Sequence, residues 1–62
     1  MTTFRIDIDT DNAAFEPAPD DEVVRILRAL IDRIERDDLG SEKVLMDYNG
    51  NTVGRAWFEP DD

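Results

Sequence analysis

Apolar and polar residues alternate along residues 4–9, and a period of two is typical of a strand with one buried face. Phe4, Ile6 and Ile8 fall on one side of this strand, so we expect them to point inward. Asp7 and Asp9 fall on the other side, where water is the expected neighbour. The pattern therefore predicts a strand that places its apolar side chains in a core and its carboxylates outside.

Residues 20–38 repeat their apolar side chains at the spacing of an amphipathic helix. Acidic residues open this segment and complement the positive end of the helix dipole, while Gly40 is a stop signal after it. Residues 10–19 before it contain two prolines and predict a loop, whose Phe15 is expected to fold back onto the core edge. The helix is expected to present one broad apolar face, made of Val23, Val24, Ile26, Leu27, Leu30, Ile31 and Ile34.

Residues 43–48 and 51–59 have the character of two further strands, joined through Asn49-Gly50. This dipeptide is a strong hairpin signal, because both of its residues accept a positive φ. If these two residues are the whole loop, Met46 pairs with Val53 and Leu45 pairs with Gly54. One face then holds Leu45, Gly54, Ala56 and Phe58, and the other holds Val44, Met46, Tyr48, Val53 and Trp57. A shift of one residue in the loop would regroup both sets.

The predicted order of elements is β-α-β-β, which indicates a single α+β domain over residues 1–62 with a short acidic tail at 59–62. The simplest topology is a three-stranded antiparallel sheet with the helix packed on one face and the first strand beside the last. Gly54 and Ala56 are small enough to let the helix approach closely. The other face would expose Val44, Met46, Val53 and Trp57, which indicates either a dimer or partner contact or a different register.

The chain is strongly acidic, with 16 Asp or Glu residues against seven Lys or Arg and a net charge of −9. Self-repulsion on this scale works against a compact state. The predicted helix compensates its seven acids with four arginines, several of them at the i,i+4 spacing of ion pairs. The rest of the chain has nine acids and three basic residues, so the uncompensated charge lies mainly outside the helix.

Composition also narrows the possible chemistry. The chain has no Cys and no His, so it lacks the residues for disulfides, for imidazole or thiolate metal sites and for nucleophile–His catalysis. Residues 7–12 resemble the start of a calcium loop, but Asn12 and Ala18 replace the Gly and Glu that such a loop requires. A strongly acidic chain is repelled by nucleic acid. We therefore expect a cytoplasmic protein without catalytic activity, metal, cofactor, membrane span or direct contact to nucleic acid.

The acidic residues outside the helix are the candidate functional feature. Alternate carboxylates on a strand lie roughly 6.5–7 Å apart, a spacing that imitates the charges of a phosphate backbone. The alternative is a row of ordinary solvated side chains. Tyr48 and Trp57 are candidate interface anchors, or else aromatic residues half-buried in the sheet. The candidate partner-binding residues are Asp7, Asp9, Asp11, Glu16, Asp37, Asp38, Asp47, Tyr48, Trp57 and Glu59.

Residues 10–15 and 47–54, with a helix like Arg25-Ile26-Leu27-Arg28 between them, resemble small proteins of bacterial phages and mobile elements. With this size and acidity the chain is similar to the anti-CRISPR proteins. That resemblance implies a DNA mimic that occupies the basic DNA- or PAM-binding surface of a Cascade or Cas effector in a bacterial host. Two other interpretations stay open: an interaction protein that dimerises through its open sheet face, and an ordinary acidic domain of a halophile.

Overall fold

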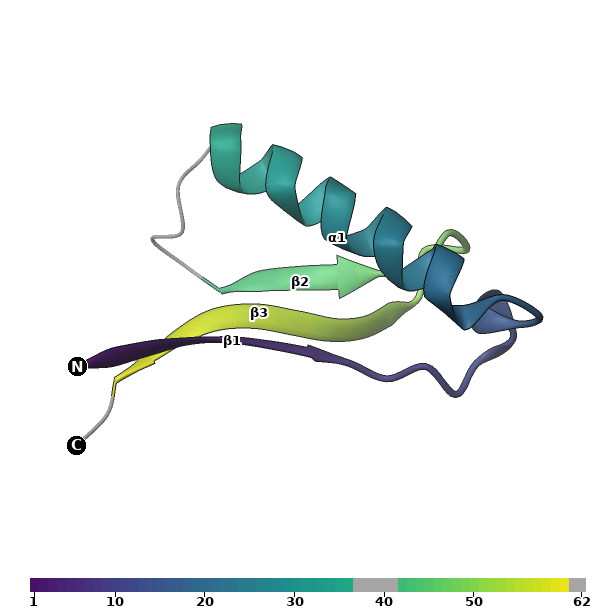
Figure 1. The fold of residues 1–62 in the computed structure, drawn as a ribbon, viewed down its shortest axis with the longest axis horizontal. Coiled ribbons are helices and arrows are strands. Elements are labelled where there is room, and N and C mark those ends of the chain that lie inside the picture. The colour runs from purple at the N-terminus through teal and green to yellow at the C-terminus, as the bar shows by residue number, and fades with distance from the viewer. Residues whose placement is uncertain (37–41, 61–62) are drawn as a thin grey trace.

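The protein folds as one helix on a three-stranded antiparallel sheet (Figure 1). The structure, a computed structural model, describes residues 1–36 and 42–60. The sheet order is β1-β3-β2, so the predicted α+β class, the β-α-β-β order and the pairing of the first strand with the last are confirmed. The elements are β1 (Thr2–Ile8), the 3-10 helix η1 (Ala13–Phe15), α1 (Pro19–Arg36), β2 (Lys43–Met46) and β3 (Thr52–Pro60).

Several boundaries differ from the sequence prediction. The helix α1 begins one residue early, at Pro19, where a proline suits the first turn. Its predicted last residues, Asp37 and Asp38, and the stop signal Gly40 lie outside the described residues. Glu59 and Pro60 belong to β3, so the predicted tail at 59–62 is wrong for these two residues, and residues 61 and 62 lie outside the described range.

The hairpin between β2 and β3 closes through a longer loop than predicted. The Asp47 N–H donates to the Asn51 carbonyl at 2.9 Å, and the Gly50 N–H donates to the Asp47 carbonyl at 3.0 Å. Gly50 has a φ of 87°, which is typical of a three-residue loop that ends in a left-handed residue. Asn49 and Gly50 are therefore not the whole loop, and Tyr48 belongs to the loop and not to the predicted strand 43–48.

A β-bulge in β3 restores the predicted strand register from Leu45 onward, although the hairpin loop is one residue longer. Met46 pairs with Thr52, whereas Leu45 pairs with Gly54, so Val53 is an extra residue in β3. A bulge of this kind turns the extra side chain away from the regular alternation. The predicted pair of Leu45 and Gly54 is confirmed, but the pair of Met46 and Val53 is wrong. Val53 consequently lies in the core with 8% exposure, not on the open face of the sheet.

The core lies between α1, η1 and the helix-facing side of β2 and β3. Phe15 and Leu45 are its largest fully enclosed side chains, and Phe15 is more central than the expected contact at the core edge. The helix packs mainly against β2 and η1 (Figure 1). The buried hydrophobic residues are Ala14, Phe15, Ile26, Leu30, Leu45, Val53 and Ala56.

The predicted apolar faces are broader than this core. Phe4 and Ile6 keep 37% and 44% of their surface exposed, and only Ile8 of the first strand packs against the core. The reason is the position of the helix, which covers β2 and leaves the helix-facing side of β1 open. Val24 and Ile31 are exposed on α1 for the same reason.

Candidate protein-binding surface

The loop after β1 is built by short polar contacts. The Asp9 N–H donates to the Val53 carbonyl at 2.7 Å, and the Asp9 carboxylate accepts the Asp11 N–H at 3.0 Å. This Asx turn ends the strand, so Asp7, Asp9 and Asp11 do not continue as one straight row of carboxylates. The Asn12 side chain then accepts the Ala14 N–H at 2.8 Å and caps η1, which places Phe15 in the core.

Asp47 ties this loop to the β2–β3 hairpin. One carboxylate oxygen accepts the N–H groups of Asn49 and Asn51, each at 2.9 Å, and the other accepts the side-chain amides of Asn12 and Asn51 at 2.9 and 3.1 Å. Burial by itself raises the pKa of Asp47, but these hydrogen bonds outweigh it and hold the pKa below its usual value. With 4% exposure and four hydrogen bonds, Asp47 connects these loops and offers little surface for the partner contact predicted for it.

Glu22 makes the matching connection from the helix. Its two oxygens accept a bidentate pair of bonds from Arg25 at 2.8 and 2.9 Å, and one of them also accepts the Tyr48 N–H at 2.9 Å. The Arg25 bond is the main reason why the pKa of Glu22 lies below its usual value, despite its burial. Glu22 and Asp47 together fix the first turn of α1, the loop after β1 and the hairpin loop to one another.

These contacts create an acidic end of the molecule, which we define as Asp9, Asp11, Glu16, Asp20 and Asp21. The loop after β1, the start of α1 and the hairpin loop gather at one end of the fold (Figure 1). Residues 9–24 and 47–54, which form this end, contain no Lys or Arg, and the next residue, Arg25, is paired with Glu22. All five carboxylates of the acidic end are exposed, and no ion pair within the described part of the chain engages them.

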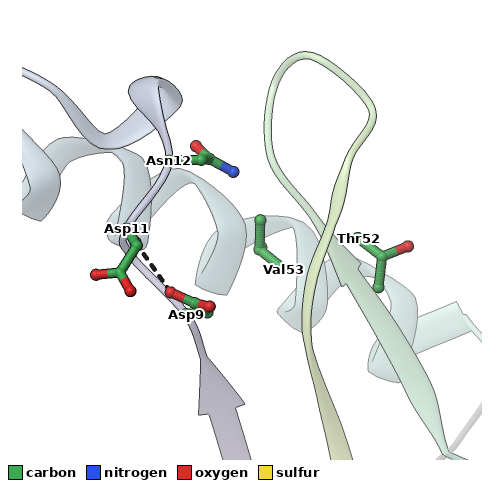
Figure 2. Close-up of a pocket in the computed structure, with 5 residues that line it drawn as sticks. All are labelled: Asp9, Asp11, Asn12, Thr52 and Val53. Atoms are coloured by element: carbon green, nitrogen blue, oxygen red, sulfur yellow. Dashed lines mark hydrogen bonds between the residues drawn. The ribbon is translucent and has the colours of Figure 1, made fainter.

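A shallow hollow of about 310 Å³ lies beside this end, between the chain after β1 and the start of β3. Figure 2 shows Asp9 and Asp11 on one wall and Val53 and Thr52 on the other, with Asn12 above them. Within residues 1–36 and 42–60, no group of three or more acidic side chains is placed to hold a metal ion. The hollow adds a concave surface of mixed polar and apolar character to the acidic end.

The other predicted site residues are scattered. Asp7 lies opposite Arg55 in the sheet, and Glu59 forms an ion pair with Arg5. Trp57 is half-buried, with the Arg55 guanidinium 4.3 Å from the centre of its ring. Tyr48 is 61% exposed, whereas Asp37 and Asp38 lie outside the described residues.

Sequence reasoning left Asp20 and Asp21 out of the candidate site. In the first turn of α1 they complement the helix dipole, as the sequence predicts. The start of α1, which carries them, lies at the same end of the fold as the loop after β1 (Figure 1). The absence of basic residues from 9–24 was the available signal, since this run contains six acids.

No helix in the described ranges combines the length and apolar character that crossing a bilayer requires. Comparison with family models, with curated proteins and with solved structures finds no match to this chain.

Proposed function

We propose that the protein is a non-catalytic inhibitor that binds a basic nucleic-acid-binding surface of another protein and competes with nucleic acid there. The observation that supports this proposal is the acidic end. It presents five exposed carboxylates on a surface that contains no Lys or Arg in the segments that form it.

The construction of this end favours binding over simple solubility. Its loops are fixed by the bonds of Asn12 to Asp47 and of Glu22 to Tyr48. A surface held in place loses little conformational freedom when it binds, so more of its interaction energy remains as affinity. A cluster of negatively charged carboxylates also attracts a basic groove at long range and so raises the rate at which the two proteins associate. Salt weakens this attraction.

The resemblance to anti-CRISPR proteins makes a Cascade or Cas effector the first partner to test, in the cytoplasm of a bacterial host. Such an effector holds DNA in a positively charged channel and reads the PAM with basic side chains. In this proposal Asp9, Asp11 and Glu16 take the places of phosphates. Tyr48, exposed on the neighbouring hairpin loop, supplies an aromatic contact at the edge.

A competition experiment tests the proposal. Labelled duplex DNA is bound to a panel of purified Cascade and Cas effectors, and its release is followed by fluorescence anisotropy as the protein is added. We expect release from one effector class, at concentrations that rise with salt. A pull-down from bacterial lysate extends the search to basic proteins whose capture is prevented by added DNA. If the protein releases DNA from no effector and captures no such protein, the proposed function is wrong.

Two double variants separate the acidic end from net charge. Asp11→Asn with Glu16→Gln and Asp32→Asn with Glu35→Gln each change the net charge from −9 to −7, and all four side chains are exposed. We expect the first pair to weaken inhibition about tenfold and the second to leave it nearly unchanged. Equal losses for both pairs would mean that total charge acts, not this surface.

A further inference from the structure

The two outer edges of the sheet differ in how they are covered. Along β2, Arg25 donates to the Met46 carbonyl at 3.0 Å and Arg33 donates to the Val44 carbonyl. These bonds from α1 occupy the outward carbonyls and protect that edge from further pairing. β1 is the other outer strand, and it has a neighbouring strand on one side only.

The hydrogen-bond pattern shows which groups of β1 point outward. The Asp9 N–H donates to Val53, and the Asp7 carbonyl lies against Gly54 of β3, so the odd-numbered residues direct their backbone groups to β3. In an antiparallel ladder the intervening residues direct theirs to the other side. The N–H and C=O groups of Phe4, Ile6 and Ile8 therefore form the free edge, and within the described residues no partner bonds them.

The same three residues place apolar side chains on the helix-facing side of the sheet. Phe4 and Ile6 remain 37% and 44% exposed. Phe4 packs against Phe58, which is 49% exposed, with ring centres 5.1 Å apart and ring planes tilted by 50°. An open strand edge beside exposed apolar side chains is a surface suited to pairing with another strand.

We propose that this edge pairs with β1 of a second copy of the chain, antiparallel and centred on Ile6, to form a continuous six-stranded sheet. This register makes Ile6 face its own equivalent and Phe4 face Ile8. Every outward N–H and C=O group of these residues then has a partner, because the same residues point outward in both copies. The apolar side chains also meet on one face, so the pairing satisfies both the backbone and the exposed hydrophobic surface.

Charge complementarity selects this occupant and this register. On the opposite face, the centre at Ile6 places Arg5, which also pairs with Glu59 of its own chain, directly across from Asp7 of the second copy, twice in the dimer. β1 carries one base and one acid, so this edge is neutral in a molecule whose net charge is −9. The antiparallel arrangement also sends the two acidic ends to opposite ends of the dimer, where their repulsion is smallest. The inference does not depend on the proposed function.

Sedimentation velocity of the intact chain tests the dimer directly. We expect a concentration-dependent species with twice the chain mass of 7.1 kDa. The Phe4, Ile6 and Ile8 amides should be protected from hydrogen exchange at high protein concentration and exchange rapidly on dilution. A monomer that persists to millimolar concentration, or a dimer in which these amides stay unprotected, would overturn the proposal.

Two charge variants test the register. Arg5→Asp places like charges across the pair in its own dimer, and Asp7→Arg does the same, so each alone should dimerise about tenfold more weakly. An equimolar mixture of the two variants restores both opposite-charge pairs, and we expect a mixed dimer of nearly parental affinity. Circular dichroism checks that each variant folds.

Arg28→Asp and Asp32→Arg on the exposed side of α1 make the same changes of charge away from the edge. These controls should dimerise like the parent, alone or mixed. If the β1 variants do not recover on mixing, the register is wrong. If they fail to fold, the concentration dependence of amide exchange in the parent decides the proposal by itself.

Discussion

The close approach of β1 and β3 makes Gly54→Ala a severe test of the fold. A Cβ atom built on Gly54 would lie 1.8 Å from the Asp7 carbonyl oxygen and 2.8 Å from its carbon. The sequence predicts that this glycine makes room for the helix, but the crowding is with the backbone of the neighbouring strand. Real Cβ atoms essentially never come closer than 3.0 Å, so β1 must move away by about 1.2 Å.

The magnitude follows from this geometry. Overpacking costs about 1–3 kcal/mol when side chains yield, and here backbone must yield, so we expect a loss of about 3 kcal/mol or more. Gly50→Ala is the comparison, since nothing lies within 4 Å of its added Cβ and only the φ of 87° is strained. That strain costs about 1–2 kcal/mol, and Gly50→Asn should cost less because asparagine tolerates this conformation.

Urea unfolding, followed by Trp57 fluorescence and by circular dichroism, measures these differences. A domain of this size has a free energy of unfolding of roughly 3–9 kcal/mol, so Gly54→Ala should remove much of it, whereas Gly50→Ala keeps a cooperative transition. The described packing of β1 on β3 is incorrect if the urea midpoint of Gly54→Ala equals that of the parent. It is also incorrect if the urea midpoint of Gly54→Ala is higher than that of Gly50→Ala.

Three further predictions concern the core, the buried carboxylates and the acidic end. Leu45→Ala removes a side chain with 1% exposure and should cost about 2–5 kcal/mol, while Met46→Ala at the neighbouring exposed position should stay within about 0.5 kcal/mol in the same urea assay. The pKa values of Glu22 and Asp47 are lower in the folded protein than in the unfolded chain, so the unfolded chain binds more protons in acid. The two carboxylates therefore stabilise the fold at a pH above their ordinary pKa values of 4.5 and 3.8. This stabilisation is lost as the pH falls through their lower pKa values in the folded protein. Asp47→Asn should therefore be less stable than the parent at neutral pH, and the difference should narrow in acid; a difference that widens would contradict the assignment. Salt screens the repulsion of the acidic end, so the thermal midpoint should rise modestly up to about 1 M NaCl, and a steep rise would instead favour the halophile interpretation.

Much of the fold was predictable because local patterns carried it. The alternation over residues 4–9 and the helical period after Pro19 are properties of neighbouring residues, and both produced the correct elements. The hairpin was predicted from Asn49-Gly50, but its loop length was not, because Asp47 supplies bonds that favour a three-residue loop. An aspartate directly before a turn, such as Asp47, is a sequence signal for hydrogen bonds to the turn backbone, whereas Asp47 stands among the predicted partner-binding residues.

The candidate site was predictable only in part. The acidity of residues 9–16 was evident from the chain itself, whereas the inclusion of Asp20 and Asp21 depends on where the helix begins in space. Burial separated Asp47 from the other carboxylates, and sequence charge contains no information about burial. The ion pairs of Arg55 with Glu42 and of Arg5 with Glu59 likewise compensate charges that appeared unopposed along the chain.

The element order and the excess of acid were readable from the chain, because they depend on local periodicity and on composition, and the place of β1 beside β3 was readable because the helix returns the chain to the start of the sheet. Tertiary structure alone decided the position of the helix over β2, the bulge that turns Val53 inward and the open edge of β1. These features depend on contacts between residues far apart in the chain, where small differences in packing select one register over another. The same contacts determine which acids are structural and which remain on the surface.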